Sequence, residues 1–101
     1  MKIPTILMLT LLAVPAIAAP DGASLFKSKC AMCHGPDGSG KTAIGKSMNV
    51  KNLSLPDVQK QTDAQLSAVV VNGKNKMPGY KGKLSADEIR EIVRHVRTFR
   101  K

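Results

Sequence analysis

The sequence predicts an all-α fold, because three stretches carry helix signals and no stretch alternates polar and apolar residues as a half-buried strand does. The chain has 101 residues, which suits a single domain. A chain this short with so few large apolar side chains builds only a small core of its own. We therefore expect a bound apolar group to complete the core.

The first 18 residues have the features of a cleavable signal peptide. A lysine at the second position is followed by an apolar run over residues 6–14 and then by small residues. Ala16 and Ala18 satisfy the small-x-small rule, so we expect cleavage to remove residues 1–18 and to leave residues 19–101 as the mature domain. An uncleaved anchor is the alternative, but a membrane-spanning helix needs roughly 20 apolar residues and this run is shorter. Export predicts a periplasmic location.

The first helix is predicted to begin at Asp21, whose side chain is a good N-cap, and to end near residues 34–35. It places Leu25 and Phe26 one turn before Cys30. This helix therefore leads directly into the cysteine pair of the chain.

Two further helices are predicted by capping boxes. Thr62-x-x-Gln65 opens one that stops at Gly73, and Ser85-x-x-Glu88 opens the last. Each box precedes an apolar face, formed by Leu66, Val69 and Val70 in the first case and by Ile89, Ile92, Val93 and Val96 in the second.

The remaining segments give weaker signals. A short helical turn is predicted near Pro56, and residues 35–54 and 74–84 are predicted to be irregular, because both stretches are rich in Gly, Lys and Asn. Long loops in so small a domain also indicate a bound group.

The central motif is Cys30-Ala31-Met32-Cys33-His34, the CxxCH arrangement of covalent c-type haem attachment. Its two thiols are spaced to form thioethers with the two haem vinyl groups, and His34 follows as an axial iron ligand. A structural zinc site would need four ligands, and the chain has only two cysteines and two histidines. A thioredoxin-like redox pair would need a βαβ context that the sequence lacks.

An electron-transfer haem needs a second axial ligand, and a methionine thioether raises its reduction potential. We predict Met77, which lies in a proline-containing loop between two helices. Met48 is the reserve ligand and is otherwise expected to fill core space, while Met32 is expected to be packing or surface. His95 is expected to be a contact residue of the last helix, although a His/His iron is an alternative.

The formal charge is +9, and +8 after loss of Lys2, the only charged residue before Asp21. Such a basic chain predicts acidic protein partners or an anionic membrane surface. Nucleic acid is excluded by export and by the presence of only one tyrosine and two phenylalanines. The alternative is that the lysines only keep the protein soluble.

Over nearly its whole mature length the chain resembles the short bacterial class I c-type cytochromes. Gly22 and Phe26 match the small-and-aromatic pair of the family's first helix, CAMCHGPDGSGK matches its haem motif and glycine loop, and Leu53 resembles a pocket leucine. Met77-Pro78-Gly79-Tyr80 resembles the ligand loop, with tyrosine in place of a commoner phenylalanine.

The resemblance implies three main helices and long loops wrapped around one covalent haem c, with Cys30 and Cys33 as thioether residues and His34 and Met77 as iron ligands. It also implies that the first and last helices cross, so that Gly22 and Phe26 meet Ile92 and His95. An aromatic residue usually holds the position of His95, which puts the tightness of this crossing in doubt.

The function expected is one-electron transfer between redox proteins of a respiratory or related chain, without catalysis on a substrate. The acidic partner would be a membrane cytochrome complex, an oxidase, a reductase or a dehydrogenase, and the carrier itself is expected to be a monomer. Six lysines are expected to surround the exposed haem edge: Lys27, Lys29, Lys74, Lys76, Lys81 and Lys83. The alternatives are a haem subunit of a larger oxidoreductase, or a ligand-binding sensor or peroxidase if Met77 does not bind the iron.

Overall fold

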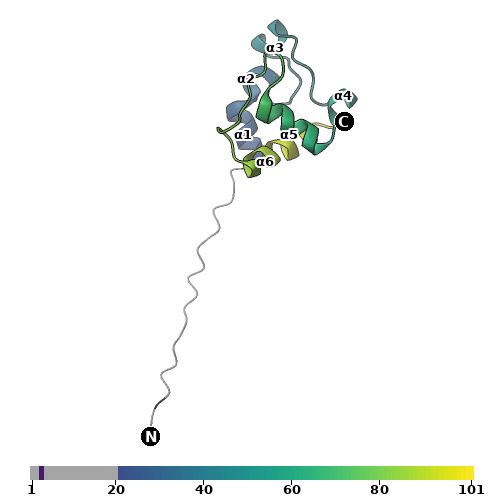
Figure 1. The fold of residues 1–101 in the computed structure, drawn as a ribbon. Coiled ribbons are helices and arrows are strands. Elements are labelled where there is room, and N and C mark those ends of the chain that lie inside the picture. Colours follow the sequence, from purple (N-terminus) through teal and green to yellow (C-terminus); the bar gives the residue numbers. More distant parts are fainter. Residues whose placement is uncertain (1–2, 4–20) are drawn as a thin grey trace.

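The computed structural model describes residue 3 and residues 21–101, and within them it contains helices but no strand beyond one isolated bridge. The predicted signal peptide lies outside the described residues apart from Ile3. In chain order the helices are α1 (Gly22–Lys29), α2 (Ala31–His34), α3 (Ala43–Ser47), α4 (Pro56–Gln59), α5 (Asp63–Asn72) and α6 (Ala86–Arg97). The predicted all-α class is confirmed (Figure 1). None of these helices is long and apolar enough to cross a bilayer.

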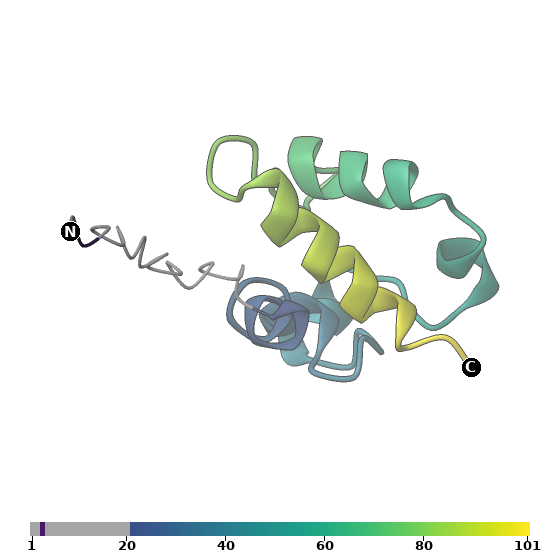
Figure 2. The same cartoon turned by 90° about the horizontal axis from the view of Figure 1, so that it is seen from below.

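The core lies where α6 crosses α1, and α5 runs along the other side of α6 (Figure 2). Phe26 on α1 and Ile92 on α6 are its most deeply buried side chains, at 2% and 1% exposure. The other buried members of this cluster are Leu25, Val58 and Val96. Burial of these apolar side chains is the main stabilising contribution of the chain itself.

The first helix begins at Asp21 as predicted, with Asp21 Oδ1 accepting a hydrogen bond from the Ser24 amide at 3.1 Å. The sequence predicts one helix through residue 34, whereas the structure divides it into α1 and α2 at Cys30, which ends the first helix and precedes the second. Gly35 then ends α2 with φ +81°, a conformation that favours glycine.

Both predicted capping boxes are present. The Thr62 and Ser85 hydroxyls accept from the amides at N3, and the Gln65 and Glu88 side chains accept from the N-cap amides. Helix α5 ends at Gly73 with φ +76°, as predicted. The apolar face of α6 is buried as predicted, and the weak signal near residue 56 corresponds to α4.

Helix α3 lies in a segment predicted to be irregular, and that prediction is wrong over five residues. The Thr42 hydroxyl caps α3 by accepting from the Gly45 amide at 2.8 Å. Met48, expected to fill core space, is 43% exposed at the end of this helix. Met48 is therefore not a member of the core cluster.

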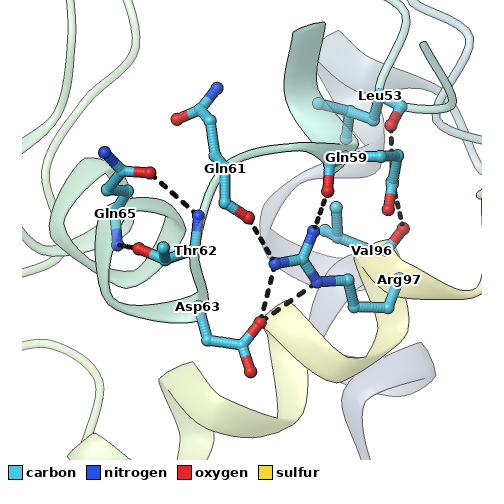
Figure 3. A network of polar contacts seen from close by, with 8 residues as sticks. All are labelled: Leu53, Gln59, Gln61, Thr62, Asp63, Gln65, Val96 and Arg97. Carbon is cyan, nitrogen blue, oxygen red and sulfur yellow. Dashed lines mark hydrogen bonds and ion pairs between the residues drawn. The ribbon is translucent and has the colours of Figure 1, made fainter. Parts of the chain in front are cut away.

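A polar network joins the end of α6 to the α4–α5 connection (Figure 3). Arg97 donates to the carbonyl oxygens of Gln59 and Gln61 at 2.8 and 2.6 Å and to Asp63 Oδ1 at 2.8 and 3.1 Å. One guanidinium thereby satisfies three acceptors that belong to the turn between two helices.

Gln59 extends this network into the loop before α4. Its Nε2 donates to the Leu53 carbonyl at 2.7 Å and to the Val96 carbonyl at 3.0 Å. The side chain therefore ties the segment around Leu53 to the last turn of α6 (Figure 3).

Candidate functional site

The three donor residues of the CxxCH motif gather around the α1–α2 break. Cys30 occupies the break, Cys33 and His34 belong to α2, and both thiols are free. The amides of Cys33 and His34 both bond to the Cys30 carbonyl, at 3.3 and 3.0 Å. A single tight turn thus positions two sulfur atoms and one imidazole.

The glycine-rich segment that follows is fastened to this turn. The Thr42 hydroxyl donates to the Cys33 carbonyl at 3.0 Å, and the Gly40 amide donates to the His34 carbonyl at 2.7 Å. Gly45 fits against them, since a Cβ there would collide with the Cys33 carbonyl oxygen. These bonds fix the backbone that carries Cys33 and His34.

His34 is in a state suited to metal ligation. Burial lowers the pKa of its imidazole, so the ring is neutral at pH 7, and its ring centroid lies 6.3 Å from that of Phe26 in the core. Its Nδ1 is buried and has no hydrogen-bond partner in the protein. The described residues therefore leave one nitrogen of this imidazole without a hydrogen bond, and a neutral imidazole nitrogen can bind a metal.

The Cys30 thiol does not have the lowered pKa of a redox-active cysteine. Burial and then the neighbouring Cys33 raise the pKa of the Cys30 thiol to about 11. The activated cysteine of a catalytic CxxC pair has a lowered pKa, whereas this thiol is protonated at pH 7. No group of three or more His, Cys, Asp or Glu side chains in residues 21–101 could hold a metal ion.

Met77 lies at the end of a tight turn that opens the α5–α6 connection. Its amide and carbonyl both bond to Lys74, at 2.9 and 3.2 Å, and Asn75 turns the chain between them with φ +54°. Gly73 lies directly behind, where a Cβ would stand 2.6 Å from the Met77 carbonyl oxygen. The backbone of Met77 is therefore held on both sides, and its side chain is half-buried.

The residues after Met77 are bound to the end of α5. The amides of Tyr80 and Lys81 donate to the Val70 and Val71 carbonyls at 2.9 and 3.0 Å. A Cβ on Gly79 would stand 2.7 Å from the Val71 carbonyl oxygen, so only glycine allows this close approach. Two backbone hydrogen bonds therefore attach the residues after Met77 to the end of α5.

One hydrogen bond connects the Met77 loop to the cysteine turn. The Tyr80 hydroxyl donates to the Lys29 carbonyl at 3.0 Å across 51 residues of sequence. The α5–α6 connection consequently runs beside the end of α1 (Figure 1). This bond brings the two predicted ligand segments into one assembly.

Several apolar side chains at the rim of the core cluster are only half-buried. Leu53, Leu66 and Leu84 pack against the core cluster without becoming fully buried. Such a rim fits a large apolar group, and the two thiols, one imidazole and one thioether form the donor set of a covalently attached haem. The residues present therefore fit a haem.

The remaining candidate ligands are either exposed or part of the contact between helices. Met32 is 72% exposed, in agreement with a surface role, and Met48 is exposed beyond α3. His95 is a helix-contact residue as expected, with its ring centroid 5.2 Å from Phe26 and 5.0 Å from Phe99. The expected meeting of Gly22 and Phe26 with α6 is also present.

Charge is distributed unevenly around the site. Neither residues 22–36 nor residues 64–86 contain an acidic residue. The lysines of these segments are exposed, and none is within ion-pair distance of a carboxylate among the described residues: Lys27, Lys29, Lys74, Lys76, Lys81 and Lys83. The four ion pairs of that part of the chain lie on or beside α4 and α6.

Two contributions to the site were missed by the sequence reasoning. Thr42 both caps α3 and donates a hydrogen bond to the Cys33 carbonyl. The capping role could have been predicted, because threonine is a good N-cap and precedes a short run of small residues. The bond to Cys33 could not. The hydrogen bond of Tyr80 has no local signal, because its acceptor is a backbone carbonyl far away in sequence.

Comparison with known proteins gives consistent matches. A family model described as "Cytochrome C oxidase, cbb3-type, subunit III" matches residues 17–96. Cytochrome c6 of Nostoc sp. (strain PCC 7120) is 33% identical over 84 residues, which are 81% of this chain and 73% of that protein. Cytochrome c6 of Leptolyngbya boryana is 36% identical over 78 residues, covering 77% of this chain and 88% of its own.

A solved structure has the same fold. The protein described as "KustC0563 c-type cytochrome" superposes with a TM-score of 0.74 at 30% sequence identity. The superposition covers 81% of this chain and all of that one.

Proposed function

Because this chain belongs to the family of small class I c-type cytochromes, we propose that it is a periplasmic carrier of single electrons between redox proteins of a respiratory or related chain. Residues 1–18 direct export and are removed, and residues 19–101 form the monomeric carrier. The observation that carries the proposal is the hydrogen-bonded assembly of the CxxCH turn and the Met77 loop.

Four residues hold the cofactor in this proposal. Cys30 and Cys33 would form the thioethers of one haem c, and His34 and Met77 would bind its iron. The haem supplies the one-electron redox change, and the chain supplies rigid ligands and an apolar surrounding that limits access of water. The exposed positions of Met32 and Met48 support Met77 as the methionine ligand.

The residues around Met77 in sequence favour an electron carrier over a peroxidase. Residues 64–86 contain no Asp, Glu or His, so no acid–base group stands near the Met77 loop in sequence. Occupation of the sixth iron position by Met77 also leaves no open position for a substrate.

A second candidate is a haem subunit of a larger oxidoreductase, which the description of the matching family model favours. The two candidates share the haem site and differ in affinity for the partner. A free carrier elutes from a sizing column as a monomer after gentle extraction, whereas a subunit remains with the membrane fraction.

The unpaired lysines define the proposed docking face for an acidic redox partner, with an anionic membrane surface as a second contact. No carboxylate in their own segments neutralises them. Long-range attraction of this kind accelerates encounter without requiring tight binding. Electron transfer can then be followed quickly by dissociation, as a mobile carrier needs.

The proposal is tested by producing the full chain in a host that attaches haem after export. The purified protein should begin at residue 19, and its mass should exceed that of the polypeptide by one haem. Replacement of both thiols, Cys30→Ser with Cys33→Ser, should abolish covalent haem, whereas Met48→Ala should leave it unchanged. Export without covalent haem in the wild-type chain would reject the proposal.

A further inference from the structure

The break between α1 and α2 leaves a backbone carbonyl available at the edge of the haem-attachment turn. At the end of α1 the Cys30 amide bonds to the Phe26 carbonyl, and the amides of Cys33 and His34 both turn to the Cys30 carbonyl. None of these amides donates to the Lys29 carbonyl, which instead accepts a hydrogen bond from the Tyr80 hydroxyl at 3.0 Å.

Tyr80 is well placed to transmit this contact to Met77. Its backbone is fixed to α5 through the Val70 carbonyl, and only Pro78 and Gly79 separate it from Met77. Pro78 has a fixed φ, and the backbone of Gly79 packs closely against the end of α5. The hydroxyl contact with α1 therefore adds a restraint, three residues after Met77, that holds the Met77 loop beside the end of α1.

The hydroxyl is the part of Tyr80 that makes this contact specific. A phenylalanine ring would keep the packing and lose the only side-chain hydrogen bond that the structure gives between the α5–α6 connection and α1. Burial raises the pKa of Tyr80 above its ordinary value, so the hydroxyl keeps its proton and remains a donor across the neutral range.

We propose that the hydrogen bond from Tyr80 to the Lys29 carbonyl is a latch that keeps the Met77 loop closed against the haem-attachment turn and so limits replacement of Met77 by other ligands. The inference rests on the proposed function, in which Met77 binds the haem iron. Tyr80 is a positioning residue, because it acts through the loop and touches no reacting atom.

The latch predicts a kinetic effect on ligand exchange. Binding of imidazole to the oxidised haem protein, followed at pH 8 by stopped-flow absorption, requires the Met77 loop to open. Loss of one hydrogen bond should increase the opening equilibrium, so Tyr80→Phe should bind imidazole about fivefold faster than the wild type. The weak near-infrared absorption of methionine-bound iron should still be present in this variant without added imidazole.

Lys29→Ala is the matched control. It removes the Lys29 side chain and keeps the carbonyl that accepts from Tyr80, so its rate should equal that of the wild type. A second control, Ile92→Val, destabilises the core at a residue that is 1% exposed and far in sequence from the loop. It should lower the unfolding temperature without accelerating imidazole binding.

The outcomes are separable. An unchanged rate in Tyr80→Phe, with a wild-type protein that shows the methionine absorption, would reject the latch alone. Equal acceleration in Tyr80→Phe and Ile92→Val would also reject it, since the effect would then follow global stability. A wild-type protein without methionine absorption would reject both the latch and the assignment of Met77.

Discussion

A Cβ built on Gly22 would collide with the backbone carbonyl of Glu91, at the point where α1 and α6 cross. The same Cβ would stand 3.1 Å from the Cβ of His95. The absence of a side chain at residue 22 therefore sets how closely the two helices approach. The distance of closest approach in turn decides how deeply Phe26 and Ile92 are buried.

Gly22→Ala should destabilise the protein in spite of the higher helix propensity of alanine. The added methyl group has to push α6 away from α1, and overpacking of this kind costs about 1–3 kcal/mol. The free energy of unfolding from guanidinium titration measures the loss. Lys27→Ala, an exposed change on the same helix, should stay within about 0.5 kcal/mol of the wild type. Equal stability of the two variants would contradict the close crossing.

Arg97→Lys should destabilise the protein by about 1–2 kcal/mol, because an ammonium group cannot reach the three acceptors that the guanidinium satisfies together. Arg94→Lys is the matched control on the same helix. Arg94 makes a single exposed ion pair with Glu91 at 3.7 Å, so its replacement should cost no more than about 0.5 kcal/mol. The free energy of unfolding of both variants is measured by denaturant titration. If the two variants lose similar amounts of stability, the Arg97 network does not stabilise the fold.

Asp21 should make the stability of the protein dependent on pH in the acid range. The hydrogen bonds from the Ser24 amide and hydroxyl hold the pKa of Asp21 below its ordinary value near 3.8. The folded protein then binds this proton less readily than the unfolded chain, so the stabilisation is complete above about pH 4 and is lost as the pH falls further.

Asp21→Asn separates the contribution of the N-cap hydrogen bond from that of the carboxylate charge, because asparagine is an equally good N-cap and carries no charge. The wild type should melt slightly higher than the variant at pH 7, and its advantage should shrink as the pH falls from 4 to 3. Thermal melts at pH 7, 5, 4 and 3 measure this difference. A difference that stays constant over the whole range would show that the carboxylate charge of Asp21 does not contribute.

The six unpaired lysines of the proposed docking face should make the rate of reduction by small reagents depend on salt, in opposite directions for reagents of opposite charge. Reduction of the oxidised protein by the anion ferrocyanide should slow as salt rises, and reduction by the cation hexaammineruthenium(II) should not, since salt screens attraction in the first case and repulsion in the second. The double variant Lys76→Glu, Lys81→Glu should flatten the ferrocyanide response. Lys60→Glu, which alters a lysine already beside Asp57 on α4, should leave it nearly unchanged.

The sequence predicts those parts of the fold that depend on residues within about one helical turn of each other. The caps at Asp21, Thr62 and Ser85 are confirmed because each is a hydrogen bond between near neighbours. The buried face of α6 is confirmed because its spacing of apolar residues admits only one arrangement against a core.

The features that were not predicted depend on contacts between distant segments. Helix α3 is short, and its capping residue Thr42 is held by the carbonyl of Cys33, which no local pattern reveals. The hydrogen bond from Tyr80 to the Lys29 carbonyl likewise joins residues far apart in sequence, so no local pattern indicates it. Sequence spacing therefore predicts which residues would bind a haem, while the hydrogen bonds that position them depend on the tertiary fold.

The central claim is that His34 and Met77 bind the iron of a single haem, and near-infrared absorption of the oxidised protein tests it most directly. The wild-type protein should show the weak band of methionine-bound iron, and Met48→Ala should retain it in full. Met77→Ala should lose the band, and its reduced form should bind carbon monoxide readily. A wild-type protein without the band, or a Met77→Ala variant that keeps it, would contradict the account.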